Sequence, residues 1–369
     1  MSKVGILSMQ RILNYGSFLQ AYGLKKILED LGCNVVFVDY RPGECLVPPN
    51  GGRGVFRKIS KGLEVLKYKA SLKDKIAFIK YKNNYAENNY HYLGIDQRMN
   101  YTPELDLLVI GSDEVFNCVQ NNTNVGFSLE LFGEGNRAKR LISYAASFGN
   151  TTLNKLERYK VKDKIAECLS GFDAISVRDA NSGEIVTELT GIVPEYNVDP
   201  VLAYDFMERC KEIPPRITET KYMILYGYSG RFTKSECEKI KSYAAEKGLK
   251  IFCIGGLQSC CDKFIDCSPF QVLAYFRDAE CVVTDTFHGT IMSVITHNNF
   301  VSVVRKSGYG NAEKLTDLLK RLHLESRMTD DTGKLSQMLS FPIDYDETDN
   351  IIQKERRHTY QYLENQIKS

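Results

Sequence analysis

The chain has 369 residues, enough for two domains of ordinary size, each with its own buried core. Hydrophobic residues make up 43% of it and charged residues 25%, and these globular values exclude a disordered chain. The formal net charge of +2 excludes a strong overall field that would attract nucleic acid, so any anion site must be local.

The apolar and cysteine patterns predict a cytoplasmic protein. The N-terminal apolar run is too short for a secretory signal, and no stretch approaches the roughly 18 apolar residues of a membrane span. The 11 cysteines, an odd number scattered along the chain, predict reduced thiols. Five cysteines cluster between residues 253 and 281 without a C-x-x-C pair, so buried thiols are favoured over a metal site.

The first elements predict a βαβ unit. Residues 4–9 and 35–39 have the pattern of strands, and residues 17–31 have the apolar spacing of a helix that stops at Gly32. These assignments place the first helix directly after a short connecting loop.

That loop holds the first candidate site residues. Asn14, Gly16 and Ser17 stand where the helix begins, and a glycine there lets backbone approach a ligand closely. We expect them to contact a phosphate or a sugar, with an ordinary turn and helix cap as the alternative. The loop lacks the G-x-G-x-x-G pattern, so no nicotinamide or flavin site is predicted.

A basic insertion, at about residues 55–100, interrupts the first half. Residues 57–82 contain nine Lys or Arg against two carboxylates, with aromatic residues interleaved. One or two amphipathic helices are expected. They could lie on anionic headgroups at the inner face of the membrane, or present a solvated face over a packed stripe.

Polar side chains follow three further strands of the first half. The strand at residues 107–110 leads into Ser112 and Asp113, and the strand at 173–177 leads into Arg178. Another strand is expected at 141–146. Ser112, Asp113 and Arg178 thus stand at the carboxyl ends of predicted parallel strands and are candidate site residues. The alternative for Asp113 is an N-cap on a helix from Glu114, and that for Arg178 is a salt bridge.

The second half repeats the alternation after a linker at Pro214 and Pro215. The pattern predicts strands at 222–226, 250–254, 281–283 and 300–304, and helices at 234–247, 269–279, 311–322 and 351–367. The chain is therefore predicted to form two Rossmann-like α/β domains, residues 1–213 and 214–345, that face each other across a cleft.

The most informative stretch is residues 281–293. A buried strand runs into a polar turn with His288 and Gly289, and a helical spacing begins at Thr290. Such a turn lies at the carboxyl end of a parallel strand, where ligands bind, and imidazole can act as an acid or as a base near neutral pH. The alternative is a structural capping role. Arg305 and Lys306 follow the next strand and are further candidate anion ligands.

Seven short motifs stand in the order found in one known family. They are NYGSFLQA at 14–21, GSDEVFN at 111–117, SYAASFG at 143–149, SVRD at 176–179, DPVL at 199–202, SPF at 268–270 and VVTDTFHG at 282–289. Together they span most of residues 3–330, and on them the chain resembles the polysaccharide pyruvyl transferases.

The resemblance implies a glycosyltransferase-B-like architecture and allows a terminal helix, residues 346–369, that crosses back to the first domain. It implies transfer of pyruvate from phosphoenolpyruvate to two hydroxyls of a cell-envelope sugar, lipid-linked or otherwise activated, without metal or redox cofactor. On this reading His288 and Asp113 are catalytic, and Asp113 activates an acceptor hydroxyl. The expected acceptor ligands are Asn14, Gly16, Ser17 and Ser112. The expected donor ligands are Arg178, Thr286, Gly289, Arg305 and Lys306.

One residue departs from the family pattern. Several members carry S-x-R-x-H where this chain has TDTFH at 284–288, so Thr286 replaces an arginine. Loss of that guanidinium removes a bidentate anion partner. Either another cation, such as Arg178, Arg305 or Lys306, takes over this role, or the donor differs. Two alternatives stay open. One is a glycosyltransferase with a nucleotide-sugar donor, which a two-domain cleft would serve equally, and the other is an inactive glycan-binding homologue, which Thr286 favours.

Overall fold

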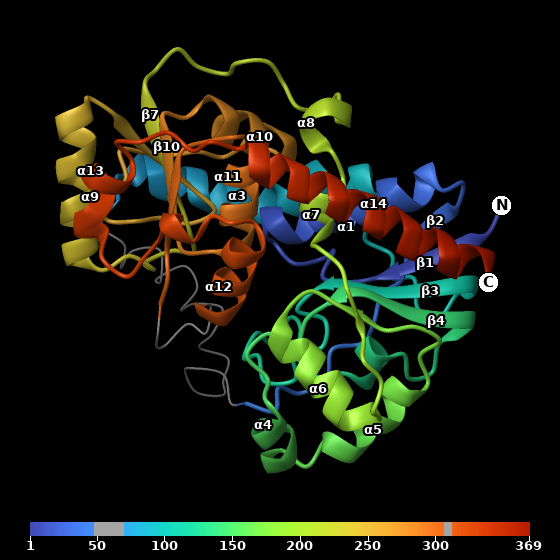
Figure 1. Cartoon of the computed structure of the whole chain (residues 1–369). Helices are drawn as coiled ribbons and strands as arrows, with labels where there is room; N and C mark the ends of the chain where they lie inside the picture. Colours follow the sequence, from blue (N-terminus) through green and yellow to red (C-terminus); the bar gives the residue numbers. More distant parts are fainter. Residues whose placement is uncertain (48–69, 306–311) are drawn as a thin grey trace. The chain divides into compact units, whose positions relative to one another are not determined.

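The computed structural model describes residues 1–47, 70–305 and 312–369 (Figure 1). The chain divides into two compact units, which we call unit 1 and unit 2. Unit 1 comprises Met1–Gly51, Tyr90–Tyr204 and Asn350–Ser369, and unit 2 comprises Gly52–Asn89 and Asp205–Asp349. Each contains a six-stranded parallel sheet with helices, which confirms the predicted α/β class with two Rossmann-like domains. Residues 70–89 thus group with unit 2, although they interrupt the first half of the sequence.

The sheet of unit 1 has the strand order β2-β1-β3-β4-β5-β6. Its strands are β1 (Lys3–Leu7), β2 (Asn34–Phe37), β3 (Glu104–Asp113), β4 (Arg137–Ala146), β5 (Ser176–Val177) and β6 (Glu195–Tyr196). Because β1 is followed by β2 on one side and pairs with β3 on the other, the strand order reverses between β1 and β3. In open α/β sheets this reversal point is where ligands bind.

Several strands of unit 1 differ from the prediction in their bounds, among them β3 and β5. β3 continues through Asp113 because its end pairs with β4, Asp113 lying opposite Ala146. β5 is shorter than predicted, and Ala174 contributes only an isolated bridge to Ile142. Pairing partners far away in sequence set both outcomes.

The helices of unit 1 cover this sheet. They are α1 (Tyr15–Asp30), α4 (Leu153–Arg158), α5 (Lys162–Ser170), α6 (Ala180–Thr190), α7 (Pro200–Ala203) and the 3-10 turn η1 (Leu129–Phe132). The terminal helix α14 (Asp346–Lys368) contributes its later turns, where Tyr362 donates to the Ser143 carbonyl over 2.9 Å and Arg356 to the Leu202 carbonyl over 3.0 Å.

The sheet of unit 2 has the order β12-β11-β10-β7-β8-β9. Its strands are β7 (Tyr222–Tyr226), β8 (Lys250–Ile254), β9 (Lys263–Phe264), β10 (Cys281–Thr284), β11 (Phe300–Val303) and β12 (Met328–Thr329). β7 pairs with β8 on one side and with β10 on the other, so the order reverses between β7 and β10. β7, β10 and β11 are buried along their whole length, as their apolar sequences predict.

The helices of unit 2 follow the predicted alternation. They are α8 (Phe206–Arg209), α9 (Lys234–Lys247), α10 (Pro269–Asp278), α11 (Phe287–Ile295), α12 (Ala312–Arg321), α13 (Leu335–Met338), η2 (Glu325–Arg327) and η3 (Thr332–Lys334). α9 and α13 lie side by side (Figure 1). α11 begins three residues before the predicted start at Thr290, because the Thr286 hydroxyl caps it. His288 therefore lies in the first helical turn.

Helix α3 (Leu72–Leu93) covers the edge strand β9 of unit 2. The Asp74 carboxylate accepts a hydrogen bond of 2.8 Å from the Phe264 amide, and Phe78 packs edge-on against Phe264 with ring centroids 5.2 Å apart. A packed stripe of this kind shields a strand edge that would otherwise be open to pairing. The rest of the predicted basic insertion, residues 55–69, lies outside the described residues.

None of the helices that the structure describes is both long enough and apolar enough to cross a membrane. The 11 cysteines carry free thiols, most of them buried.

Candidate active site

Three side chains of unit 1 meet at the reversal point between β1 and β3. The Ser17 hydroxyl, in the first turn of α1, donates to Asp113 Oδ2 over 2.7 Å. Arg178, which follows β5, donates from Nη2 to Asp113 Oδ1 over 3.3 Å and from Nη1 to Asp199 Oδ2 over 2.7 Å. The structure thus brings together three predicted residues and adds Asp199, to which no role was given.

The charges of this group are almost fully removed from water. The side chains of Arg178 and Asp199 are 2% and 0% exposed, and that of Asp113 is 13% exposed. Burial lowers the pKa of Arg178, but Asp113 and Asp199 more than offset this and leave that pKa above its ordinary value. The guanidinium therefore stays charged. Because the group holds two carboxylates and one cation, it favours a ligand whose hydroxyl groups donate hydrogen bonds over a ligand that is itself an anion.

The backbone around Asp113 has an unusual conformation. Asp113 has φ of 75°, a region that residues other than glycine rarely occupy. Gly111 has φ of 129°, and a Cβ there would lie 2.1 Å from the Tyr144 carbonyl oxygen. Turns follow Asp113, so the alternative in which it caps a helix from Glu114 is wrong. Strained backbone of this kind is common at functional sites.

The other predicted acceptor residues have structural contacts. Asn14 is the N-cap of α1, and its Oδ1 accepts from the Gly16 amide over 2.8 Å, which matches the turn-and-cap alternative. Ser112 is fully buried and donates to the Ala145 carbonyl over 2.9 Å. These residues shape the loop and strand end that carry Ser17 and Asp113.

Unit 2 has a charged group at its own reversal point, between β7 and β10. Asp285 directly follows β10. Its Oδ2 accepts from Nε of Arg305 over 2.8 Å and forms an ion pair with Arg231, whose Nε lies 2.8 Å away. Arg305 also donates to Glu236 Oε1 over 2.9 Å. Burial raises the pKa of Asp285, and the two arginines oppose this rise. Arg305 is thus held in a charge network, while Lys306 lies outside the described residues.

His288 is the second residue of α11 and only 8% exposed. The free amides and positive dipole end of a helix favour an anion at this position. The Thr286 hydroxyl accepts from the Gly289 amide over 3.0 Å, and a Cβ on Gly289 would lie 2.2 Å from Thr284 Oγ1. Thr286 and Gly289 therefore build the turn that presents His288.

Four charged residues of these groups, Asp199, Arg231, Glu236 and Asp285, were not predicted as site residues from the sequence. Asp199 and Asp285 lie in the DPVL and VVTDTFHG motifs, so the sequence shows two carboxylates there but not the residues that they contact. Arg231 lies in the loop after β7, the first strand of the second half, where the binding rule for open α/β sheets would have pointed to it.

Neither group has the composition of a metal centre. Among the described residues no set of three His, Cys, Asp or Glu side chains could hold an ion.

The comparisons with known proteins agree with this architecture. A family profile described as polysaccharide pyruvyl transferase matches residues 14–307. The chain is similar to the structure of UDP-GlcNAc 2-epimerase from Neisseria meningitidis bound to UDP-GlcNAc, with a TM-score of 0.52 and 10% identity over 100% of both chains. The Methanocaldococcus jannaschii UDP-GlcNAc 2-epimerase gives a TM-score of 0.47 and 9% identity over 96% of this chain and 99% of that one. No curated protein matches the sequence. The Neisseria likeness shows a common fold.

Proposed function

Because the chain belongs to the polysaccharide pyruvyl transferase family, we propose that its donor is phosphoenolpyruvate and that its product is a cyclic pyruvate ketal. In this reaction two hydroxyls of one sugar in a polysaccharide precursor add to the pyruvyl carbon, and inorganic phosphate leaves. The match over most of the chain supports pyruvyl transfer to a saccharide.

The proposed reaction begins at the methylene carbon of phosphoenolpyruvate. The His288 imidazolium protonates that carbon, and a sugar hydroxyl attacks the resulting oxocarbenium-like centre while its proton passes to Asp113. The bond to phosphate then breaks and inorganic phosphate leaves. The second hydroxyl attacks the same carbon, and its proton passes to the His288 imidazole, which became neutral in the first step, as the ketal closes. Each proton transfer of this kind is worth about 10²–10⁴-fold in rate.

The observation that carries this proposal is the place of His288. It lies in the first turn of a nine-residue helix, at the point where the sheet of unit 2 reverses its strand order. A phosphorylated donor is favoured there because backbone amides and the helix dipole stabilise its charge. Arg231 and Arg305 add positive charge at the same strand ends, although Asp285 and Glu236 balance it.

The group in unit 1 supports the acceptor role. Asp113 is held by Ser17 and Arg178, and the two aspartates outnumber the one arginine. We therefore propose that Asp113 is the base and that Arg178 positions it, in place of the donor-binding role predicted for Arg178. Hydroxyl groups, which donate hydrogen bonds, match such a site better than a doubly acidic donor.

The direct test supplies the protein with phosphoenolpyruvate labelled with ¹³C at carbon 2 and with a lipid-linked or soluble glycan precursor. We expect phosphate release together with a new quaternary ketal carbon in the NMR spectrum. Release of a nucleoside diphosphate from UDP-sugars, without phosphate release from phosphoenolpyruvate, would instead support a glycosyltransferase.

We also propose that α3 contacts anionic headgroups, where a lipid-linked acceptor is found. Leu72, Ile76 and Ile79 recur at helical spacing and are 76%, 50% and 41% exposed. Two residues seven positions apart lie on the same side of a helix. Lys73 and Lys80 therefore border one flank of this apolar stripe, and Lys75 and Lys82 border the other. Such a pattern favours shallow binding at an anionic membrane surface.

A further inference from the structure

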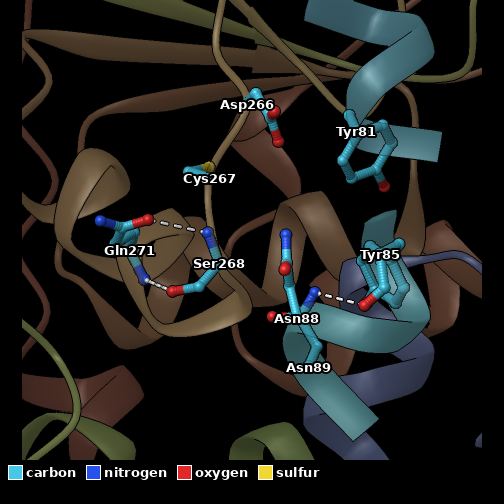
Figure 2. A pocket seen from close by; sticks show the side chains of 8 residues that line it. All are labelled: Tyr81, Tyr85, Asn88, Asn89, Asp266, Cys267, Ser268 and Gln271. Atoms are coloured by element: carbon cyan, nitrogen blue, oxygen red, sulfur yellow. Dashed lines mark hydrogen bonds between the residues drawn. The ribbon is translucent and has the colours of Figure 1, made fainter. Parts of the chain in front are cut away.

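Unit 2 contains a cavity that the proposed reaction does not use. It has a volume of about 250 Å³ and lies between helix α3 and the segment that joins β9 to α10 (Figure 2). Its lining residues are Tyr81, Tyr85, Asn88 and Asn89 from α3, and Asp266, Cys267, Ser268 and Gln271 from the facing segment. None of them belongs to the groups around Asp113 or His288.

The cavity wall includes a buried hydrogen-bond acceptor. Asn89 is 3% exposed, and its amide nitrogen donates to the Tyr85 carbonyl over 2.8 Å (Figure 2). This bond fixes the orientation of the amide, so Oδ1 is the atom left over. Oδ1 is buried and has no hydrogen-bond partner among the described residues. An unsatisfied buried oxygen is costly, and a ligand that donates a hydrogen bond would remove this cost.

The side chains of the facing wall are held in place by hydrogen bonds, and this wall also offers several oxygens that can accept hydrogen bonds. The Ser268 amide donates to Gln271 Oε1 over 2.8 Å, and the Gln271 amide donates to Ser268 Oγ over 3.2 Å (Figure 2). This capping box holds both side chains at the start of α10. Asp266, two residues before the cap, adds a carboxylate. A phosphate or carboxylate ligand would meet this negative charge, so an anion is disfavoured.

Aromatic rings complete the lining. Tyr81 and Tyr85 pack edge to face with centroids 5.5 Å apart, and Tyr81 also packs against Phe264. Tyrosine offers an apolar ring surface together with a polar tip. The cavity has the volume of about eight water molecules, which lies below the range of pockets for drug-sized ligands.

We propose that this cavity is a saccharide subsite that binds one neutral sugar residue of the acceptor glycan. Sugar hydroxyls donate to Asn89 Oδ1 and to the Asp266 carboxylate, and a face of the sugar ring packs on the tyrosines. The proposal rests on the saccharide acceptor of the proposed function. It adds a site that recognises a sugar through residues that take no part in pyruvyl transfer.

The test measures binding without the reaction. Saturation-transfer NMR on the full chain uses the methyl glycosides of glucose, galactose, mannose and N-acetylglucosamine as probes. We expect transfer from the protein to at least one of them, and about tenfold weaker binding in Asn89→Leu. The matched control is Asn84→Leu, an exposed position on the same helix outside the cavity, which should bind like the wild type.

Two further measurements keep the result interpretable if Asn89→Leu unfolds. Asp266→Asn preserves the side-chain shape and should weaken binding of the same glycoside at least threefold. The bound glycoside should also slow alkylation of Cys267, which lines the cavity, but not of Cys45 in unit 1. Both measurements use folded protein, as checked by its thermal unfolding transition.

Absence of saturation transfer and of Cys267 protection with all four glycosides would overturn the proposal. Equal loss of binding in Asn84→Leu, or protection of Cys267 by uridine alone, would also overturn it. Glycoside binding here without phosphate release from phosphoenolpyruvate would support the saccharide subsite and refute the proposal that phosphoenolpyruvate is the donor. Phosphate release without glycoside binding would support the donor and refute the subsite.

Discussion

The Ser17 hydroxyl donates to Asp113 Oδ2 over 2.7 Å and joins the first turn of α1 to the end of β3. Arg178 binds the other carboxylate oxygen, Oδ1, over 3.3 Å. Asp113 is therefore held on both oxygens at the point where the strand order of unit 1 reverses. A carboxylate fixed in this way can receive a proton from a hydroxyl without first having to be oriented.

Asp113→Asn should remove the base while preserving the shape of the side chain. We expect the rate of phosphate release from phosphoenolpyruvate, with acceptor present, to fall by about 100-fold or more. The matched control is Asp106→Asn on the same strand, a half-buried residue that pairs with Lys139. Similar rates for the two variants would show that Asp113 does not transfer a proton.

Arg178→Met should destabilise unit 1 by about 3–5 kcal/mol, because it leaves Asp113 and the fully buried Asp199 without their cation. Urea unfolding measures this free energy. Arg41→Met breaks the pair with Glu130, in which the arginine is 58% exposed, and should cost about 0–1 kcal/mol. Equal losses in the two variants would contradict the account of the buried group.

Glu236 should make the free energy of unfolding of unit 2 fall at low pH. Burial raises the pKa of Glu236, but the Thr233 amide and Arg305 more than offset this, and the net pKa lies below the ordinary value of 4.5. The unfolded chain therefore takes up the proton first as the pH falls. The stabilisation by Glu236 is complete above about pH 4.5 and is lost as the pH falls through the lower folded pKa.

Glu236→Gln isolates this effect, because a glutamine oxygen can still accept from the Thr233 amide in the capping box. We expect the wild type to be more stable than the variant at pH 6 and the difference to shrink below pH 4.5. Unfolding free energies measured across this range decide the point. A difference that grows with acid would have the wrong sign.

The apolar stripe on α3 should contribute to membrane binding. Ile76→Ser combined with Ile79→Ser should reduce cosedimentation with vesicles that contain phosphatidylglycerol, and high salt should reduce that of the wild type. Ile192→Ser, an exposed isoleucine of unit 1, is the control. Unchanged cosedimentation of the double variant would refute the contact.

Elements with strong local signals could be predicted from the sequence. Helix α9 has the predicted bounds, because a capping box from Thr233 to Glu236 starts it and Gly248, with φ of 65°, ends it. β7 and β8 also match, since their apolar runs suit buried parallel strands.

The charged groups could not be predicted in the same way. The partners of Arg178 lie 65 and 21 residues away, and Asp285 and Glu236 share Arg305 as a partner. Local pattern placed Arg178 and Asp285 at strand ends and Glu236 in a helix. It could not show that Arg178 is held by carboxylates, since this depends on the order of strands in the folded sheet.

The central claim is that His288 transfers the proton that activates the donor. The most direct measurement compares initial rates of phosphate release from phosphoenolpyruvate, with acceptor present, in wild type, His288→Ala and the control His297→Ala. His297 is 55% exposed, pairs with Asp349 and lies on no strand end. We predict a loss of about 100-fold or more for His288→Ala with the thermal transition retained, and little change for the control. A loss below about tenfold in folded His288→Ala protein would contradict the account.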